Sequence, residues 1–252
     1  MHISSYNEMH YLLGRLAAHF YGLNPKRTVM VLDLGSRTSD PPGLIYKKIA
    51  NQLKFEYTGL DISPGNNVDV VPEDPYKIPV ETESFDIVIS GQAFEHIEFP
   101  WLTIKEVARV LKPGGYAIII APSSGREHRS PVDCWRIYPD GMAALAKWAG
   151  MENVYSATSW DETRLFLWGD TVGMFFKPPQ GGSSRDSSAP KLQINESIYS
   201  IRHYTVIRRL YIFLVGILKS MAMPWIIERR IPSITKRSAL VTNLLEKQRT
   251  DF

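Results

Sequence analysis

The stretch Val29-Met-Val-Leu-Asp-Leu-Gly35 is an apolar run that contains one acid and ends at a glycine. A continuous run of large apolar residues is typical of a strand buried on both faces of a parallel sheet. A glycine directly after such a strand lets the backbone turn tightly and approach a ligand closely. The stretch therefore predicts the first strand of an α/β domain, with Asp33 and Gly35 at its ligand-facing end.

Helix-like and strand-like segments alternate around this stretch. The spacing of apolar residues predicts helices over 10–23, 44–53, 99–111 and 138–149, and strands over 55–60, 68–71, 85–90, 116–121, 151–156 and 164–176. Alternation of this kind predicts a Rossmann-like, doubly wound and mainly parallel sheet, here of seven strands. Such sheets bind ligands outside the carboxyl ends of their strands.

The composition fits one α/β domain with an additional segment. The chain has 252 residues, of which 44% are hydrophobic and 22% charged, as in ordinary globular proteins. We divide it into an N-terminal helical cap (1–25), the α/β domain (26–176), a flexible linker rich in Pro, Gly and Ser (177–191) and a C-terminal helical segment (192–252).

A single cysteine and an N-terminus without an apolar signal core predict a cytoplasmic protein.

An acid also closes the second predicted strand. Asp61 follows Tyr57-Thr-Gly-Leu60, a place from which a carboxylate can accept hydrogen bonds from both ribose hydroxyls. The alternative is a solvated aspartate in a turn. No G-x-G-x-x-G follows the first strand, which argues against a nicotinamide-dependent oxidoreductase.

Two further stretches complete a family pattern. They are Glu73-Asp-Pro-Tyr76 followed by Glu83-Ser-Phe-Asp-Ile-Val-Ile-Ser-Gly-Gln-Ala-Phe-Glu-His96, and Glu106-Val-Ala-Arg-Val-Leu-Lys-Pro-Gly-Gly-Tyr116. With the stretches at Asp33 and Asp61, they stand in the order and spacing of class I S-adenosylmethionine-dependent methyltransferases of the small-molecule type. Residues 29–121 resemble that family.

The resemblance implies S-adenosylmethionine as the cofactor and a set of residues that surround it. The matching positions are Asp33 and Gly35 for the methionine part, Asp61 for the ribose, Ile62 and Asp74 for the adenine, and Gln92 and Phe94 for the wall of the cofactor pocket. The first motif departs from the pattern, because Arg37 and Ser39 stand where the family usually has further glycines.

The segment over 121–142 resembles a branch of bacterial methyltransferases associated with glycan and cell-surface polysaccharide synthesis. It follows a predicted strand and should overhang the ligand-binding edge, and its aromatic and polar side chains suit a sugar hydroxyl as acceptor. We name His128, His96 and Asp133 as candidates for general-base catalysis, because histidine titrates near neutral pH and an aspartate can orient it or act itself.

Structural roles are the alternatives for these residues. Asp133 could simply pair with Arg136 in a structural loop, and His96 could cap the helix that follows it. No metal is expected, because no group of His, Cys and carboxylate residues shows ligand spacing along the chain.

The C-terminal segment is basic. Residues 193–252 hold ten Lys and Arg against four Asp and Glu, a net charge of +6, whereas the rest of the chain sums to −3. Its longest uncharged apolar run, over 210–218, is too short to span a bilayer, which takes about 20 residues. The pattern fits a helix lying peripherally on an anionic membrane. It equally fits a helix packed on the α/β domain or on a partner.

The sequence thus predicts a methyltransferase that acts on a hydroxyl of a sugar or glycan precursor. The alternative is a non-catalytic S-adenosylmethionine-binding subunit that acts through its C-terminal segment. Nucleic acid is not an expected partner, because the basic residues are not interleaved with the site motifs. The oligomeric state is left open.

Overall fold

The computed structural model describes residues 3–38, 43–160, 169–179, 189–190, 192 and 194. The chain divides into two compact units, residues 1–199 and 200–252, and all described residues belong to the first. Ser39, most of the predicted linker and nearly all of the basic C-terminal segment lie outside the described residues, so those predictions stay predictions. Within the described ranges, no helix is both long and apolar enough to cross a membrane.

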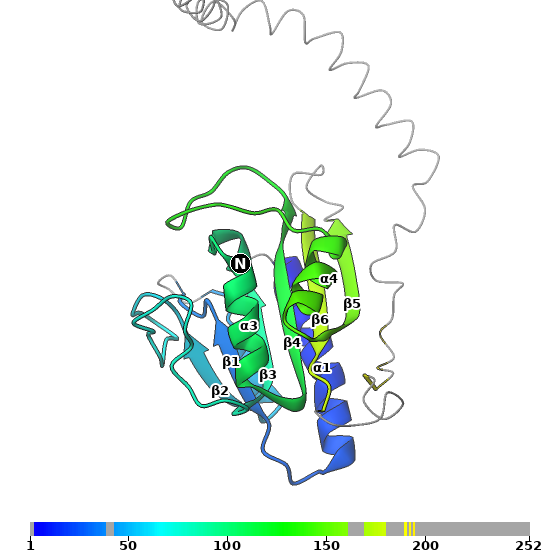
Figure 1. Ribbon diagram of the computed structural model, residues 1–252. Helices are drawn as coiled ribbons and strands as arrows, with labels where there is room; N and C mark the ends of the chain where they lie inside the picture. The colour runs from blue at the N-terminus through cyan, green and yellow to red at the C-terminus, as the bar shows by residue number, and fades with distance from the viewer. Residues whose placement is uncertain are drawn as a thin grey trace, which may run out of the picture. The chain divides into compact units, whose positions relative to one another are not determined.

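One mixed sheet forms the centre of the domain (Figure 1). Its strands are β1 (Met30–Leu34), β2 (Glu56–Leu60), β3 (Phe85–Gly91), β4 (Leu111–Ser124), β5 (Glu152–Trp160) and β6 (Gly169–Phe176), in the order β2-β1-β3-β4-β6-β5. β1 to β4 pair in parallel, whereas β6 runs antiparallel to its neighbours β4 and β5. The predicted Rossmann-like, mainly parallel α/β fold is confirmed.

The predicted strand count differs from the structure. Seven strands are expected, and the described residues form six. The segment over 68–71 makes a single parallel bridge, between Val70 and Leu60, rather than a strand. Its Val70 is only half-buried and its Val71 is exposed, so the segment has little apolar surface to hold a seventh strand at the sheet edge.

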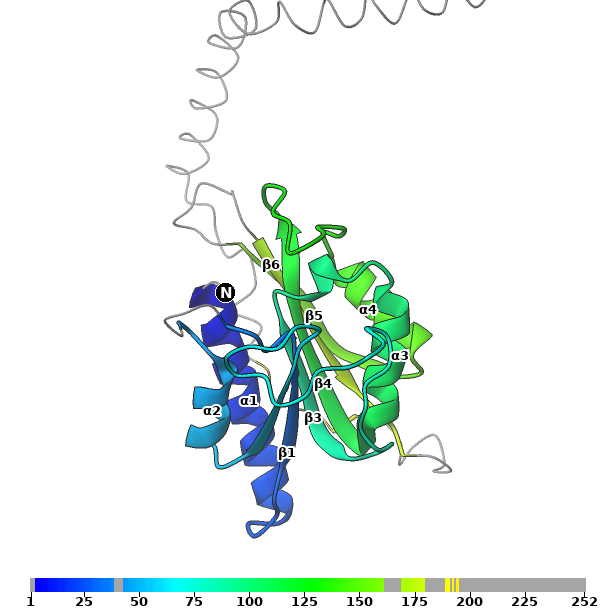
Figure 2. The ribbon, with the colours of Figure 1, turned by 90° about the vertical axis from the view of Figure 1, so that its left-hand side faces the viewer.

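Helices cover both faces of the sheet, as Figure 2 shows. α1 (Ile3–Leu23) and α2 (Tyr46–Gln52) lie on one face, and α3 (Pro100–Val110) and α4 (Pro139–Trp148) lie on the other. α1 is part of the main core, because Leu12, Leu13 and Leu16 are fully buried in the same cluster as Val31 and Ile118 of the sheet. The N-terminal helix therefore completes one face of the sheet that carries the candidate site.

A half-buried acid on α1 makes the stability of the fold depend on pH. Burial, together with the negative charge of Asp170, raises the pKa of Glu8 to about 8. In the unfolded chain this carboxyl group titrates near pH 4.5. Because the folded state holds the proton more tightly, the stabilisation is complete below pH 4.5 and is lost as the pH rises towards 8.

Replacing Glu8 by Gln should remove this loss. We expect Glu8→Gln and the wild type to unfold with similar free energies at pH 5, and the variant to be more stable by at least ~1 kcal/mol at pH 8, since a tenfold change in proton affinity corresponds to about 1.4 kcal/mol. Urea denaturation at both pH values measures this. The exposed Glu56→Gln is the matched control. Equal pH dependence of wild type and Glu8→Gln would contradict the assignment.

Candidate functional site

A cavity of about 900 Å³ opens at the carboxyl ends of β1, β2 and β3. A volume of this order accommodates a nucleoside-sized ligand together with a second small molecule. Its walls come from positions within five stretches, 34–38, 60–63, 72–78, 92–98 and 130–132, and from Thr103. The cavity therefore lies at the sheet edge that the sequence predicts.

Gly35 brings the loop after β1 close to the loop after β3. Its φ of +79° lies in the left-handed region, and a Cβ placed there would come within 2.5 Å of the Cβ of Ala93. The Gly35 amide donates to the carbonyl of Leu60 at 2.9 Å and thereby ties the end of β1 to the end of β2. The predicted need for a glycine at this wall of the cavity thus has two physical causes, the backbone conformation and the lack of space.

Asp61 and Ile62 form the adjoining wall, where β2 ends. The Asp61 carboxylate accepts hydrogen bonds from the amides of Arg37 at 3.2 Å and Ser63 at 3.1 Å, one on each oxygen. These bonds fix the carboxylate at the cavity wall. Ile62 beside it leaves 56% of its surface exposed, which offers an apolar surface next to the acid.

Gln92 lies at the end of β3 in a left-handed conformation, with a φ of +60°. A non-glycine residue in that region costs about 1–2 kcal/mol. Its amide donates to the carbonyl of Ile120 at 2.8 Å, and its side chain donates to Asp170 at 3.0 Å. These two bonds hold the turn in place against the strain, and Gln92 lines the cavity as predicted.

Three of the predicted cofactor residues do not line the cavity. Asp33 is buried on β1, where it accepts a hydrogen bond from the Tyr57 hydroxyl at 2.6 Å and where burial raises its pKa to about 7. Asp74 is exposed and accepts a hydrogen bond from the backbone amide of Tyr76. Tyr76 itself lines the cavity, whereas Asp74 does not. Phe94 is fully buried in the core. None of these three residues contacts the cavity directly, so their predicted roles in cofactor binding stay predictions.

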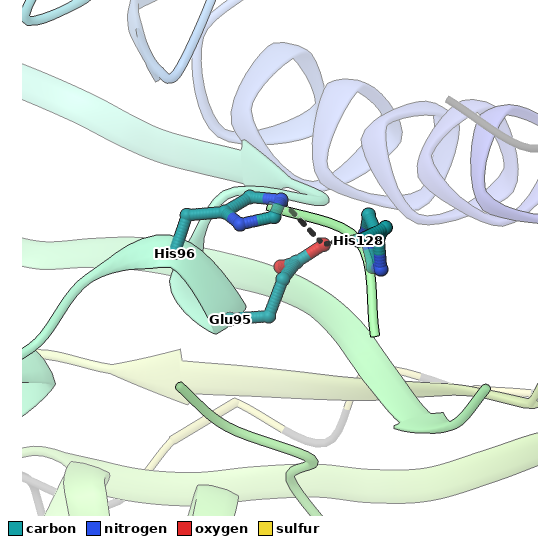
Figure 3. A group of neighbouring side chains, drawn as sticks. All are labelled: Glu95, His96 and His128. Carbon is teal, nitrogen blue, oxygen red and sulfur yellow. Dashed lines mark ion pairs between the residues drawn. The ribbon is translucent and has the colours of Figure 1, made fainter. Parts of the chain in front are cut away.

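Two of the predicted catalytic residues meet at an acid that sequence reasoning missed. Glu95 and His96 belong to the short 3-10 helix η1 (Phe94–His96), and His128 comes from the loop after β4 (Figure 3). The Nε2 atoms of His96 and His128 lie 3.7 and 3.9 Å from Oε1 of Glu95. The His96 side chain also lines the cavity. We call these three residues the Glu95 cluster.

Glu95 has an unusual environment for an acid. The residue is fully buried, and neither carboxylate oxygen has a hydrogen-bond partner among the described residues. Burial raises its pKa to about 7. In the sequence, the one available signal is an acid placed among small and apolar residues directly after a buried strand.

The loop over 125–138 is fixed to η1 mainly through the backbone of Glu95. The carbonyl oxygen of Glu95 accepts bonds from the amides of Cys134 at 2.7 Å and Trp135 at 3.2 Å. The Trp135 indole donates to the carbonyl of Ile97 at 2.8 Å, and Nδ1 of His96 contacts the carbonyl of Val132. These contacts place the loop over the cavity, as predicted, and bring His128 beside Glu95.

Asp133 serves this loop as a structural acid. Both of its oxygens pair with the Arg136 guanidinium, at 2.6 and 2.8 Å, and the His128 amide donates to it at 2.7 Å. The side-chain hydrogen bond from Arg136 holds the pKa of Asp133 well below its usual range. Such an acid accepts a proton poorly, so the structure favours the orienting role for Asp133 over that of a base. His96, in turn, does not cap α3, whose N-cap residue is Phe99.

Comparison with known proteins agrees with this geometry. Residues 32–119 match the family described as a methyltransferase domain. The matched stretch makes up about a third of the chain. It contains most of β1, all of β2, β3, η1 and α3, and therefore most of the cavity wall.

The chain is also similar to several curated methyltransferases. It is 30% identical over 105 residues to the malonyl-acyl-carrier-protein O-methyltransferase of a Marinomonas species, covering 38% of this chain and 39% of that protein. It is 34% identical over 80 residues to the demethylmenaquinone methyltransferase of Staphylococcus haemolyticus, covering 27% of this chain and 34% of that protein. The chain thus matches less than two fifths of the length of these relatives.

Solved structures give weaker likenesses. A SAM-dependent methyltransferase from Archaeoglobus fulgidus aligns with a TM-score of 0.47 and 15% identity, covering 66% of this chain and 93% of that one. The 1,6-didemethyltoxoflavin-N1-methyltransferase of Burkholderia thailandensis aligns with a TM-score of 0.46 and 15% identity, covering 69% and 84%.

The close approach at Gly35 gives a test of the cavity wall. We expect Gly35→Ala to lower the free energy of unfolding by the cost of the left-handed backbone, about 1–2 kcal/mol, and by a further ~1–3 kcal/mol for the clash with Ala93. Gly114→Ala is the matched control, because Gly114 has a φ of +80° and open space around it. Urea denaturation measures both. If the two variants lose equal stability, the contact with Ala93 has no energetic role.

Proposed function

We propose that the chain is an S-adenosylmethionine-dependent methyltransferase and that its acceptor is a hydroxyl of a sugar or glycan precursor. The observation that carries the proposal is the arrangement of the cavity within the methyltransferase domain. Gly35, Asp61 and Ile62 form one end of it, and His96 with the loop after β4 forms another. The first end thus suits the cofactor, and the second end suits the acceptor.

The charges at the first end support a cationic cofactor. S-adenosylmethionine carries a sulfonium and an ammonium group. The negative charge of Asp61 contributes to the raised pKa of the buried Asp33, after the effect of burial. A cation bound near two such acids relieves their mutual repulsion and is itself stabilised in a partly buried site. Asp61 at the cavity wall also remains available to ribose hydroxyls.

The second end supports a hydroxyl acceptor. Methyl transfer from a sulfonium is an in-line displacement, and fixing the two reactants in line is worth roughly 7–11 kcal/mol. The acceptor hydroxyl must lose its proton during the reaction. The Glu95 cluster lies at the border of the cavity, through His96, and supplies the groups that could draw that proton away.

An exposed row of aromatic rings supports a sugar as the acceptor. Tyr76 at the cavity wall is followed by Phe99, Trp101 and Trp135, with successive ring centroids 5.5, 5.6 and 6.1 Å apart. Phe99, Trp101 and Trp135 each leave more than a third of their surface exposed. Aromatic faces next to polar groups provide apolar contact to the C–H faces of sugar rings, so a glycan could extend from the cavity along this row.

The cofactor end is tested by removing the Asp61 carboxylate. A hydrogen bond to a charged group is worth roughly 1.5–3 kcal/mol. Asp61→Ala should therefore bind S-adenosylmethionine about tenfold more weakly or worse, as measured by calorimetry. Asp140→Ala, which removes an exposed acid from α4, should bind it as the wild type does. Unchanged affinity in a folded Asp61→Ala protein rules out the ribose role.

The acceptor end is tested by removing the His128 imidazole. His128→Ala should lower turnover about a hundredfold or more and leave the affinity for S-adenosylmethionine nearly intact, because His128 lies outside the cofactor wall. Transfer of a labelled methyl group to a panel of glycan precursors, with quinones and acyl thioesters for comparison, measures turnover and acceptor class together. Cofactor binding without transfer to any of them would favour the non-catalytic alternative.

A further inference from the structure

The Glu95 cluster contains three electron-pair donors that face one another. One ligand atom each from Glu95, His96 and His128 lies within 4.8 Å of the other two. Figure 3 shows the His96 ring directed at the Glu95 carboxylate and the His128 side chain beside the same oxygen. The carboxyl group itself is fully buried without a hydrogen-bond donor from the described residues, an arrangement that is costly unless the group is protonated or a cation is present.

The contacts of the two Nδ1 atoms indicate which nitrogen of each imidazole ring carries the proton. Nδ1 of His96 contacts the carbonyl of Val132, and Nδ1 of His128 lies 3.2 Å from the carbonyl of Arg126. A carbonyl oxygen only accepts hydrogen bonds, so each Nδ1 carries the proton. In the neutral rings Nε2 then holds a lone pair, and both Nε2 atoms point towards Oε1 of Glu95.

We propose that Glu95, His96 and His128 bind a divalent transition-metal ion of the Zn²⁺ type through one carboxylate oxygen and two Nε2 atoms. Two histidines and one carboxylate with an open fourth position form a common donor set for catalytic zinc. Oxygen partners on the far nitrogens of ligating histidines are the usual means of orienting them. Here these partners are the Val132 and Arg126 carbonyls.

The distances are close to those that this ion requires. Ligands about 2.0–2.1 Å from a tetrahedral Zn²⁺ are roughly 3.4 Å apart. The two Nε2–Oε1 separations, 3.7 and 3.9 Å, are wider by a few tenths of an ångström, and the pair of histidine ligand atoms, which lies within 4.8 Å, would move closer when the ion binds. Charges of both signs act on Glu95: the Arg136 guanidinium has the largest effect and opposes binding of a cation, whereas the negative charges of Asp170 and Asp133 favour it.

The position of the site gives the ion a role that rests on the proposed function. His96 belongs both to the cluster and to the cavity wall, so an open coordination position there can reach a molecule in the acceptor end. A divalent ion lowers the pKa of a bound hydroxyl, so an acceptor hydroxyl bound to it would release its proton to solvent more readily, and the two histidines would then act as ligands rather than as bases. Binding of the ion itself requires neither cofactor nor acceptor.

Calorimetric titration of the full chain with ZnCl₂, after EDTA treatment and without cofactor or acceptor, tests the site. We expect the wild type to bind one equivalent in this site, and Glu95→Gln and His128→Ala each to lower that affinity at least tenfold. His10→Ala, which removes an exposed histidine outside the cluster, should bind as the wild type does. Co²⁺ should give the wild type, but neither cluster variant, an absorption spectrum typical of four or five ligands.

Two results would overturn the proposal. One is the absence of Zn²⁺ binding by the wild type, in which case a shared proton alone joins the three side chains. The other is binding that persists unchanged in the cluster variants, which would locate the metal elsewhere. His128 is half-exposed on a loop, so His128→Ala keeps the test decisive if Glu95→Gln does not fold. If the wild type binds Zn²⁺ but neither binds S-adenosylmethionine nor transfers its methyl group, the proposed function is refuted and the metal site is not.

Discussion

The carbonyl oxygen of Glu95 is the point on which the candidate site depends. By accepting bonds from the amides of Cys134 and Trp135, it joins the loop after β4 to the turn after β3. These two segments are distant in the sequence and adjacent at the edge of the sheet. The same residue directs its buried carboxylate at His96 and His128. One residue thus sets the position of the loop and the electrostatics beneath it.

Buried negative charge is the second constraint. Asp33, Glu95 and Glu8 all have raised pKa values, in each case chiefly because of burial. Isolated acids in such places lower stability and persist where they serve a site. Asp170 contributes to two of these shifts and also accepts a bond from Gln92 at the cavity wall. Of the three acids, Glu95 is the one in direct contact with a residue of the cavity wall, His96.

The sequence predicts the fold well and places several of the proposed cofactor residues at the cavity, because both depend on local pattern. Apolar runs gave the parallel strands, and Gly35, Asp61, Ile62 and Gln92 all line the cavity at strand ends. The strand expected over 68–71 is a single bridge in the structure, because four residues with some apolar character do not reveal whether a sheet edge can hold them. Phe94 was placed at the cavity, although its side chain packs into the core.

The Glu95 cluster could not be predicted in the same way. Its members are brought together by backbone hydrogen bonds that have no signature in the sequence, and the separation of His96 from His128 along the chain does not indicate contact. The expectation that no metal binds was drawn from that separation. Asp133 and Arg136, by contrast, are three residues apart, and their pairing was recognised as an alternative.

The attachment of the loop has a consequence for how such enzymes diversify. Cys134 and Trp135 bind Glu95 through main-chain atoms, which every non-proline residue possesses. Side chains along the loop can therefore be exchanged by mutation without loss of this anchor, while the wall that is proposed to bind the cofactor comes from other strands and stays unchanged. Under the proposed function, a lineage could acquire a new acceptor by altering one loop and still keep its cofactor.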